Sequence, residues 1–131
     1  MRRPDEQSRR ETASALAAIG GPVSARLLGI ALRDPSAEVA IIAARAIARS
    51  GVPGSAALLS ARVSEIDLDN ADFLLGRELI GALARTPEPA ADEALAKLAS
   101  RRALIKRGHF AEVQALVGQA QQARAQGEVG R

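Results

Sequence analysis

The chain repeats itself along its length, and this internal repeat restricts the folds that it can adopt. An offset of 31 residues aligns Gly20 with Gly51 and Pro22 with Pro53, and a further offset of 36 residues aligns Pro53 with Pro89. The same offsets align three short apolar runs, which are Ala15-Leu16-Ala17, Ala46-Ile47-Ala48 and Ala82-Leu83-Ala84. Two helices and their turns take up about 30 to 45 residues in helical-repeat arrays. The repeat therefore predicts a stack of helical hairpins.

The spacing of the repeat divides the chain into units. The third unit starts later than the first offset would place it, and the extra residues fall in the acidic segment 64–70. A partial fourth unit is marked where Ala111-Glu112-Val113 repeats Ala37-Glu38-Val39. We expect one repeat domain over residues 1–126, with units at about 4–34, 35–68, 69–107 and 108–126, followed by a flexible tail at 127–131.

Glycine and proline mark the ends of the predicted helices. Gly20 and Gly51 stand where a helix can end in a left-handed residue, and a proline follows each within two residues. Asp34 offers a capping side chain before Pro35 at a first helical position. The first helices of the hairpins are thus predicted at 6–19, 36–50, 70–86 and 109–126, and the second helices at 22–33, 54–65 and 89–107.

Acidic residues mark the start of the helix predicted at 70–86. With Asp69 as the N-cap, Asp72 takes the third helical position, where the helix dipole favours negative charge. Leu68 can then pack on Phe73 as a hydrophobic staple. Counted as a calcium loop from Asp67, the segment lacks the glycine that an EF-hand needs at its sixth position. The acidic cluster is therefore interpreted as helix capping, and no metal site is predicted.

The composition of the chain agrees with a helical fold. Apolar residues make up 47% of the sequence, yet Phe73 and Phe110 are its only aromatic residues. Small and aliphatic side chains favour close helix packing over a pleated sheet, in which β-branched and aromatic residues are enriched. We predict an all-α fold of about seven helices, arranged as a short α-solenoid of hairpins.

The second unit resembles a known repeat family. Its residues Asp34-Pro35-Ser36-Ala37-Glu38-Val39, followed by Ala43-Ala44-Arg45-Ala46-Ile47-Ala48-Arg49-Ser50-Gly51, look like the bacterial HEAT-like repeat of the phycobilin-lyase type. The resemblance implies a right-handed α-solenoid whose repeats hold or organise partner proteins. Two positions depart from the pattern, because Ala40 replaces a basic residue that is often found there and Gln7-Ser8 replace the expected Glu-Val. The first outer helix is either irregular or a modified cap.

Polar residues dominate both ends of the predicted array, in the segments 5–11 and 119–126. Terminal repeats of a solenoid need a polar outer face that prevents further stacking. We therefore expect the array to end within this chain, with a piece of a longer array as the alternative.

Few residues of the chain support catalysis. Cysteine is absent, and His109 is the only histidine. These facts exclude thiolate chemistry and any site that requires two imidazoles, and no serine stands in a Gly-x-Ser-x-Gly elbow. We predict that the protein is not an enzyme and carries no cofactor and no metal. His109, which follows Gly108, is interpreted as a polar turn residue.

The hydropathy of the chain argues against a membrane location. No apolar run reaches the roughly 18 residues that a membrane-spanning helix needs, and no hydrophobic stretch follows Arg2 and Arg3. A cytoplasmic protein is expected.

The exposed residues of the second helices form the predicted binding surface, because the concave side of a solenoid usually binds partners. The buried face of the helix predicted at 22–33 is assigned to Leu27, Leu28, Ala31 and Leu32. The exposed stripe is assigned to Arg26, Ile30 and Arg33, then Ala57, Ala61 and Ser64, then Glu93, Lys97 and Ser100, with Arg101 next to it. Charges at both ends and small residues between them would admit a helix or loop. The leading hypothesis is a scaffold or adaptor that binds another protein of unknown identity.

A nucleic-acid-binding module is the alternative. The densest basic run lies in the segment 101–107, and the net charge of the chain is +3. The candidate phosphate-binding residues are Arg101, Arg102, Lys106 and Arg107. Basic side chains are also favoured at the end of a helix by the dipole, and two phenylalanines supply little surface on which bases could stack.

Overall fold

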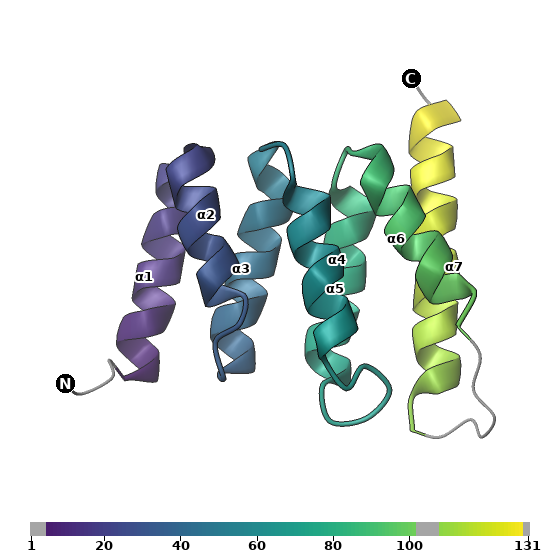
Figure 1. Cartoon of the computed structure of the whole chain (residues 1–131), viewed down its shortest axis with the longest axis horizontal. Coiled ribbons are helices and arrows are strands. Elements are labelled where there is room, and N and C mark those ends of the chain that lie inside the picture. The colour runs from purple at the N-terminus through teal and green to yellow at the C-terminus, as the bar shows by residue number, and fades with distance from the viewer. Residues whose placement is uncertain (1–4, 102–107, 130–131) are drawn as a thin grey trace.

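A computed structural model describes residues 5–101 and 108–129 of the chain. Within these ranges the chain forms seven α-helices and no β-strand (Figure 1). The helices are α1 (Glu6–Ile19), α2 (Gly21–Ala31), α3 (Ala37–Ser50), α4 (Ser55–Glu65), α5 (Phe73–Arg85), α6 (Pro89–Ala99) and α7 (Phe110–Val129). The predicted all-α fold is confirmed.

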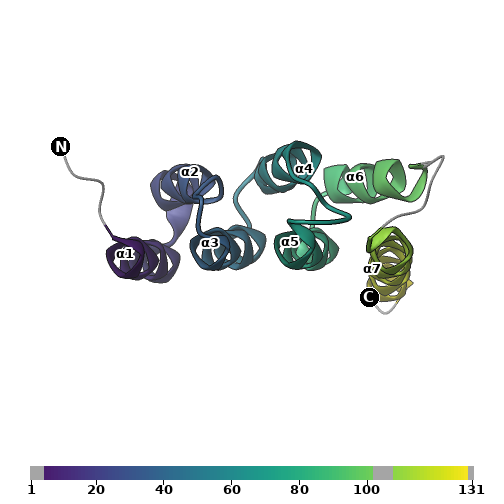
Figure 2. The same ribbon diagram turned by 90° about the horizontal axis from the view of Figure 1, so that it is seen from below.

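The helices lie in two layers, and consecutive helices pair as hairpins. Figure 2 shows α1, α3, α5 and α7 in one row and α2, α4 and α6 in the other. In the first layer α3 packs against both α1 and α5, and α5 also packs against α7. In the second layer α4 packs against α6. The hairpins α1/α2, α3/α4 and α5/α6 thus stack side by side, as the sequence repeat predicts.

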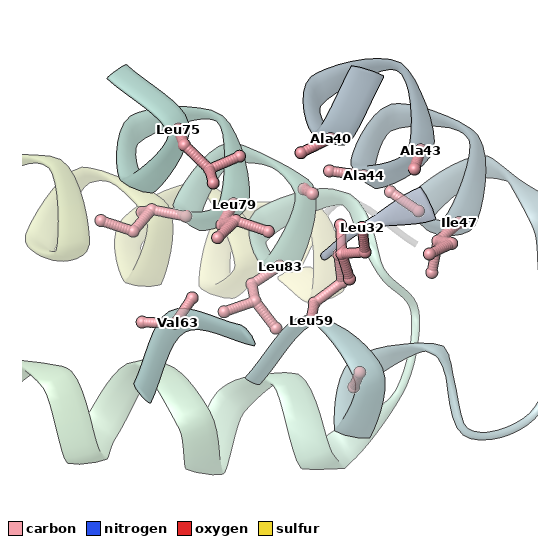
Figure 3. Packing of buried hydrophobic residues seen from close by; sticks show 14 of the residues in the cluster. Leu32, Ala40, Ala43, Ala44, Ile47, Leu59, Val63, Leu75, Leu79 and Leu83 are labelled. Carbon is pink, nitrogen blue, oxygen red and sulfur yellow. The ribbon is translucent and has the colours of Figure 1, made fainter. Parts of the chain in front are cut away.

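The core lies between the two layers and is built from small and aliphatic side chains. Ile47, Leu59, Leu79 and Leu83 are completely buried there (Figure 3). The central helix α3 contributes mostly alanine, and its buried residues are Val39, Ala40, Ala43, Ala44, Ala46, Ile47 and Ala48. Alanine costs no side-chain entropy and lets neighbouring helices approach closely, which explains how an alanine-rich chain with two aromatic residues forms a core.

The glycines end the first helices of two hairpins, as predicted. Gly51 follows α3 with a φ of 66°, in the left-handed region that side chains with a Cβ disfavour. Gly20 follows α1 with a φ of 71°, and its backbone nitrogen donates to the Leu16 carbonyl at 3.1 Å. These two residues fix the reversal of the chain at equivalent places in the first and second units.

The start of α3 differs from its prediction by the identity of the cap. Ser36 is the N-cap, and its hydroxyl accepts from the Val39 backbone nitrogen at 3.4 Å. Asp34, which was assigned this role, instead accepts from the Ser36 backbone nitrogen at 2.9 Å and forms an ion pair with Arg9 at 2.8 Å. Asp34 is thus bound to α1 through Arg9, and α3 begins at Ala37, after Pro35.

The helix α5 begins at Phe73, so the prediction of Asp69 as its N-cap was wrong. The carboxylate of Asp69 binds Arg101 at 2.8 Å, and the carboxylate of Asp72 accepts from the Asp67 backbone nitrogen at 2.8 Å. The residues inserted in this unit thus form a closed turn before the helix. Leu68 is buried and lies against Gly76 of α5.

The helix α6 ends at Ala99, whereas the sequence predicted a helix to residue 107. Ser100 donates its hydroxyl to the Lys97 carbonyl at 2.9 Å, and Arg101 turns away to reach Asp69. The prediction ran too far because no glycine or proline stands between Ala99 and Gly108. Residues 102–107 lie outside the described part of the chain.

The helix α7 continues to Val129, three residues into the segment 127–131 that the sequence predicted as a flexible tail. A single glycine such as Gly127 costs about 1 kcal/mol in a helix, which is too little to end one without other signals. Arg124, one turn earlier, binds this helix to the preceding hairpin through Asp92 at 2.6 Å.

Arginine–carboxylate pairs connect segments about one repeat apart. The sequence separations of the pairs lie between 25 and 33 residues. The pairs are Arg9 with Asp34 at 2.8 Å, Arg33 with Glu65 at 2.8 Å, Arg45 with Glu78 at 2.6 Å, Arg101 with Asp69 at 2.8 Å, and Arg124 with Asp92 at 2.6 Å. Exposed pairs contribute only about 0 to 1 kcal/mol each. Three of the five connect one unit to the next, namely Arg33–Glu65, Arg45–Glu78 and Arg124–Asp92.

Candidate protein-binding surface

The layer formed by α2, α4 and α6 carries the predicted stripe. All of its residues within or directly after these helices are exposed, namely Arg26, Ile30, Arg33, Ala57, Ala61, Ser64, Glu93, Lys97 and Ser100. Arg101 is half-buried and lies beyond the end of α6. The structure therefore brings the stripe to one layer of the molecule (Figure 2) but separates Arg101 from its exposed surface.

A groove runs between α4 and α6. Its larger part has a volume of about 370 Å³, with Val63, Leu83 and Ala94 among its apolar lining and Ser64 and Lys97 from the stripe. A second hollow of about 220 Å³ lies next to it and is lined in part by Ala57 and Glu93. The two hollows share Ser60, Ala94 and Lys97, so they form one continuous groove. Stripe residues from both helices line this groove.

Two charged side chains of α6 reach the groove. Lys97 and Glu93 are exposed, and neither forms an ion pair or hydrogen bond through its side chain with any residue that the structure describes. Asp69, which also lines the larger hollow, is already bound to Arg101. A partner in the groove would therefore meet an unpaired ammonium and an unpaired carboxylate, one turn apart on the same helix.

Charged side chains connect the end of α2 with α4. Arg33 binds Glu65 at 2.8 Å, and Arg62 lies 3.6 Å from the same carboxylate. Arg62 also donates to the Leu32 carbonyl at 3.0 Å, at the end of α2 where carbonyls lack helical partners. Arg33 is exposed, but its guanidinium already forms an ion pair between the first two hairpins.

An apolar row on α2 was missed by the sequence analysis. Val23, Leu27 and Ile30 are 75%, 42% and 68% exposed. Leu27 had been assigned to the buried face with Leu28, but only Leu28 of this pair is buried. The spacing i, i+4, i+7 places the three side chains on one face of a helix. That spacing was visible in the sequence, and the adjacent leucines obscured it.

The candidate phosphate-binding residues are only partly described. Arg101 uses its guanidinium for a two-pronged contact with Asp69, at 2.8 and 3.3 Å, and lies 5.2 Å from the centre of the Phe110 ring. Its charge is therefore compensated within the protein. Arg102, Lys106 and Arg107 lie outside the described residues.

His109 occupies the turn before α7, as predicted, and it also connects two units. Its ring stacks on Phe73 with the ring centres 3.9 Å apart, and Nδ1 lies 2.7 Å from the Glu112 carboxylate. Its backbone nitrogen donates to the Asp69 carbonyl at 2.6 Å. Gly108 has a φ of 57° and leaves no room for a side chain beside Asp69. The inserted turn of the third unit therefore docks directly onto the start of α7.

Two carboxylates at the start of α6 are used inside the protein. Glu88 accepts from the backbone nitrogens of Ala56 and Gly54 at 2.7 and 3.0 Å, and these bonds lower the pKa of Glu88 below its ordinary value. The hydrogen bond from Arg124 lowers the pKa of Asp92 in the same direction. Both carboxylates therefore act as structural contacts between units.

Neither a cluster of metal ligands nor a membrane-spanning helix is present among the described residues. Among residues 5–101 and 108–129, no three histidine or acidic side chains come together as they would around a metal ion. None of the helices in these ranges is long and apolar enough to cross a membrane.

In comparisons with known proteins, no family model, curated protein or solved structure matches this chain.

Proposed function

We propose that this protein is a non-enzymatic module that binds a partner protein through the layer formed by α2, α4 and α6. In this proposal the chain is a HEAT-like repeat of the bacterial type, forms a right-handed α-solenoid, and acts as a scaffold or adaptor in the cytoplasm. The sequence of the second unit and the stacked hairpins support the assignment to this repeat class.

The exposure of the apolar row on α2 carries the proposal. Val23 and Ile30 expose 75% and 68% of their surface in a layer whose other helices line a groove with apolar walls. Large apolar side chains left exposed in this way are typical of sites that bind other proteins. The lack of a second histidine and of any cysteine supports a binding role over catalysis.

Affinity capture with charge-reversed variants tests this function. The chain is immobilised and used to capture proteins from the organism that makes it, and bound partners are quantified by mass spectrometry. Arg26→Glu combined with Lys97→Glu changes two exposed cations of the layer that make no ion pair with the described residues. We expect recovery of the partner to fall about tenfold, the effect of losing about 1.4 kcal/mol of binding free energy.

Arg77→Glu is the matched control, because Arg77 is exposed on α5 in the other layer. It should leave recovery unchanged. Equal recovery of every partner by the wild type and the doubly reversed variant would contradict the assignment to this layer. Loss of the partner only with Arg77→Glu would instead assign the binding surface to the layer formed by α1, α3, α5 and α7.

A further inference from the structure

We infer that the outward face of α2 binds an amphipathic helix whose apolar stripe is flanked by acidic residues. This inference rests on the proposed function and names the class of partner for its surface. It follows from the arrangement of three apolar side chains and from the distribution of charge around them.

The three apolar side chains form a row that the fold leaves uncovered. Val23, Leu27 and Ile30 follow one another at i, i+4 and i+7, and therefore extend over about two turns of α2. The buried face of the same helix is formed by Ser24, Ala25 and Leu28. The described residues supply no helix that packs over the row, because α2 contacts α1 and α3 with its other side.

A row with this spacing matches one surface of a partner helix. Apolar residues at i, i+4 and i+7 on one helix pack into the grooves of another that presents the same spacing. An extended strand would alternate its side chains with a period of two and would meet the row with only every second residue. The spacing therefore favours a helix over an extended segment.

The charge that α2 itself carries is positive, because Arg26 is the one charged residue within this helix. Between Thr12 and Arg33 the chain contains no acidic residue, whereas Arg26 lies within this segment on α2. Arg26 is exposed and makes no ion pair or side-chain hydrogen bond with the described residues. The first acidic residue that follows, Asp34, is bound to Arg9. An acidic flank on the partner would therefore meet the unpaired guanidinium of Arg26.

The positive charge lies on one side of the row. Arg33 reaches Glu65 on α4, and Gly29 lies beside Leu58 of the same helix, so this side of α2 faces α4. Arg26 precedes Gly29 by three residues and Arg33 by seven, so the helical period places it on the same side of α2. We therefore expect the acidic residues of the bound helix to lie along its α4 side.

A displayed library of helices tests this inference. Its members are amphipathic helices of about five turns with a fixed apolar stripe and randomised flanks, and selection is carried out on the wild-type chain. The doubly substituted chain Val23→Gln, Ile30→Gln is the negative target. The chain Leu74→Gln is the matched control, because Leu74 is 61% exposed on α5 in the other layer. All three substituted side chains are exposed, so thermal melting should show folded proteins.

We expect acidic flanks to be enriched among the selected helices. These helices should bind the doubly substituted chain at least about tenfold more weakly, because burial of one apolar side chain lowers the dissociation constant about tenfold or more. Leu74→Gln should bind as the wild type does. Arg26→Glu should weaken binding of the acidic helix and strengthen binding of a counterpart in which lysines replace its acidic residues.

Three outcomes would overturn the inference. These are enrichment of neutral or basic flanks, equal selection on the doubly substituted chain, and binding of the row to vesicles of phosphatidylcholine and phosphatidylserine in place of the helices. If the natural partner is lost from the doubly substituted chain while acidic helices do not bind, the proposed function stands and the inference fails. If the natural partner is retained by that chain and by the charge-reversed variant, the proposed function itself fails.

Discussion

The Glu88 carboxylate lies 2.7 Å from the backbone nitrogen of Ala56, one unit earlier in the chain. The helix α4 has Gly54 at its N-cap position and no capping side chain of its own. Its first turn therefore has free backbone N–H groups, and Glu88 from the next hairpin accepts hydrogen bonds from two of them. An N-cap supplied from another unit couples the start of one helix to the packing of its neighbour.

Replacement of this cap should produce a loss of stability that depends on pH. Glu88→Gln should lower the free energy of unfolding by about 1 kcal/mol at neutral pH, the usual effect of a lost cap. Because the pKa of Glu88 is lowered in the folded protein, its contribution is complete above the ordinary value of 4.5 and is lost as pH falls through the folded pKa. Urea titrations at neutral and strongly acidic pH measure the difference, which should vanish in acid. A difference of the same size for Glu93→Gln would refute the capping role.

Arg124 should be the side chain on which the docking of α7 depends most. Its guanidinium donates to the carbonyls of Thr86 and Glu88 at 2.5 and 2.9 Å and also binds Asp92. We expect Arg124→Ala to lower the free energy of unfolding by about 2 to 3 kcal/mol, because its charged hydrogen bonds to these carbonyls and its ion pair with Asp92 are lost together. Arg124→Lys should recover only part of this loss, since an ammonium lacks the planar fork. Thermal melting measures both, and equal stability of the lysine variant and the wild type would contradict the prediction.

Two helical glycines should respond in opposite ways to alanine. A Cβ at Gly76 would lie 2.1 Å from the Cδ1 atom of Leu68, which is itself buried. We expect Gly76→Ala to destabilise the protein by about 1 to 3 kcal/mol through overpacking. Gly118 in α7 has no neighbour within 4 Å of such a Cβ, so Gly118→Ala should stabilise by up to about 1 kcal/mol through helix propensity. Chemical denaturation of both variants provides the comparison, and a stabilising Gly76→Ala would show that Leu68 moves freely.

The ion pair between Asp69 and Arg101 should protect the contact between the inserted turn and α7. Asp69→Asn removes the charge but leaves the Asp69 carbonyl that accepts from His109. Hydrogen exchange at the start of α7 should then become faster, while exchange in α3 should not change. A double-mutant cycle with Arg101→Gln should give a coupling free energy of about 1 kcal/mol. A coupling close to zero would mean that the pair is incidental.

We expect that this protein does not bind nucleic acids. Arg101 is neutralised by Asp69, which removes one of the proposed phosphate contacts. Electrophoretic mobility at low salt, with duplex DNA and single-stranded RNA as probes, should show no complex. A complex that weakens steeply as salt is raised would support the nucleic-acid alternative.

The helices were predictable from sequence because their signals are local. Gly20 and Gly51 mark helix ends through their own backbone conformations, and the repeat supplied each signal more than once. The start of α5 and the end of α6 were predicted wrongly for a shared reason. Asp69 and Arg101 bind each other across 32 residues, and neither residue alone indicates a partner so distant. A contact between residues distant in the sequence thus decided the boundaries that local rules could not.

The candidate surface was predictable to a similar extent. The exposed positions of α4 and α6 follow from helical periodicity and were located correctly. The row that contains Leu27 was not predicted, because a leucine in an apolar helix is usually buried. Only the packing against α1 and α3 decides which of the two adjacent leucines faces the core. Periodicity gives the faces of a helix, and the position of its neighbours determines which face is buried.

The ion pairs between units have a consequence for how such an array can change during evolution. Arg33 of the first unit binds Glu65 of the second, and Arg45 of the second binds Glu78 of the third. A unit that was duplicated, deleted or exchanged with another would leave one side of such a pair without its counter-charge. The repeats are similar enough to have arisen by copying, but they are no longer interchangeable. Their order along the chain has become part of what the sequence encodes.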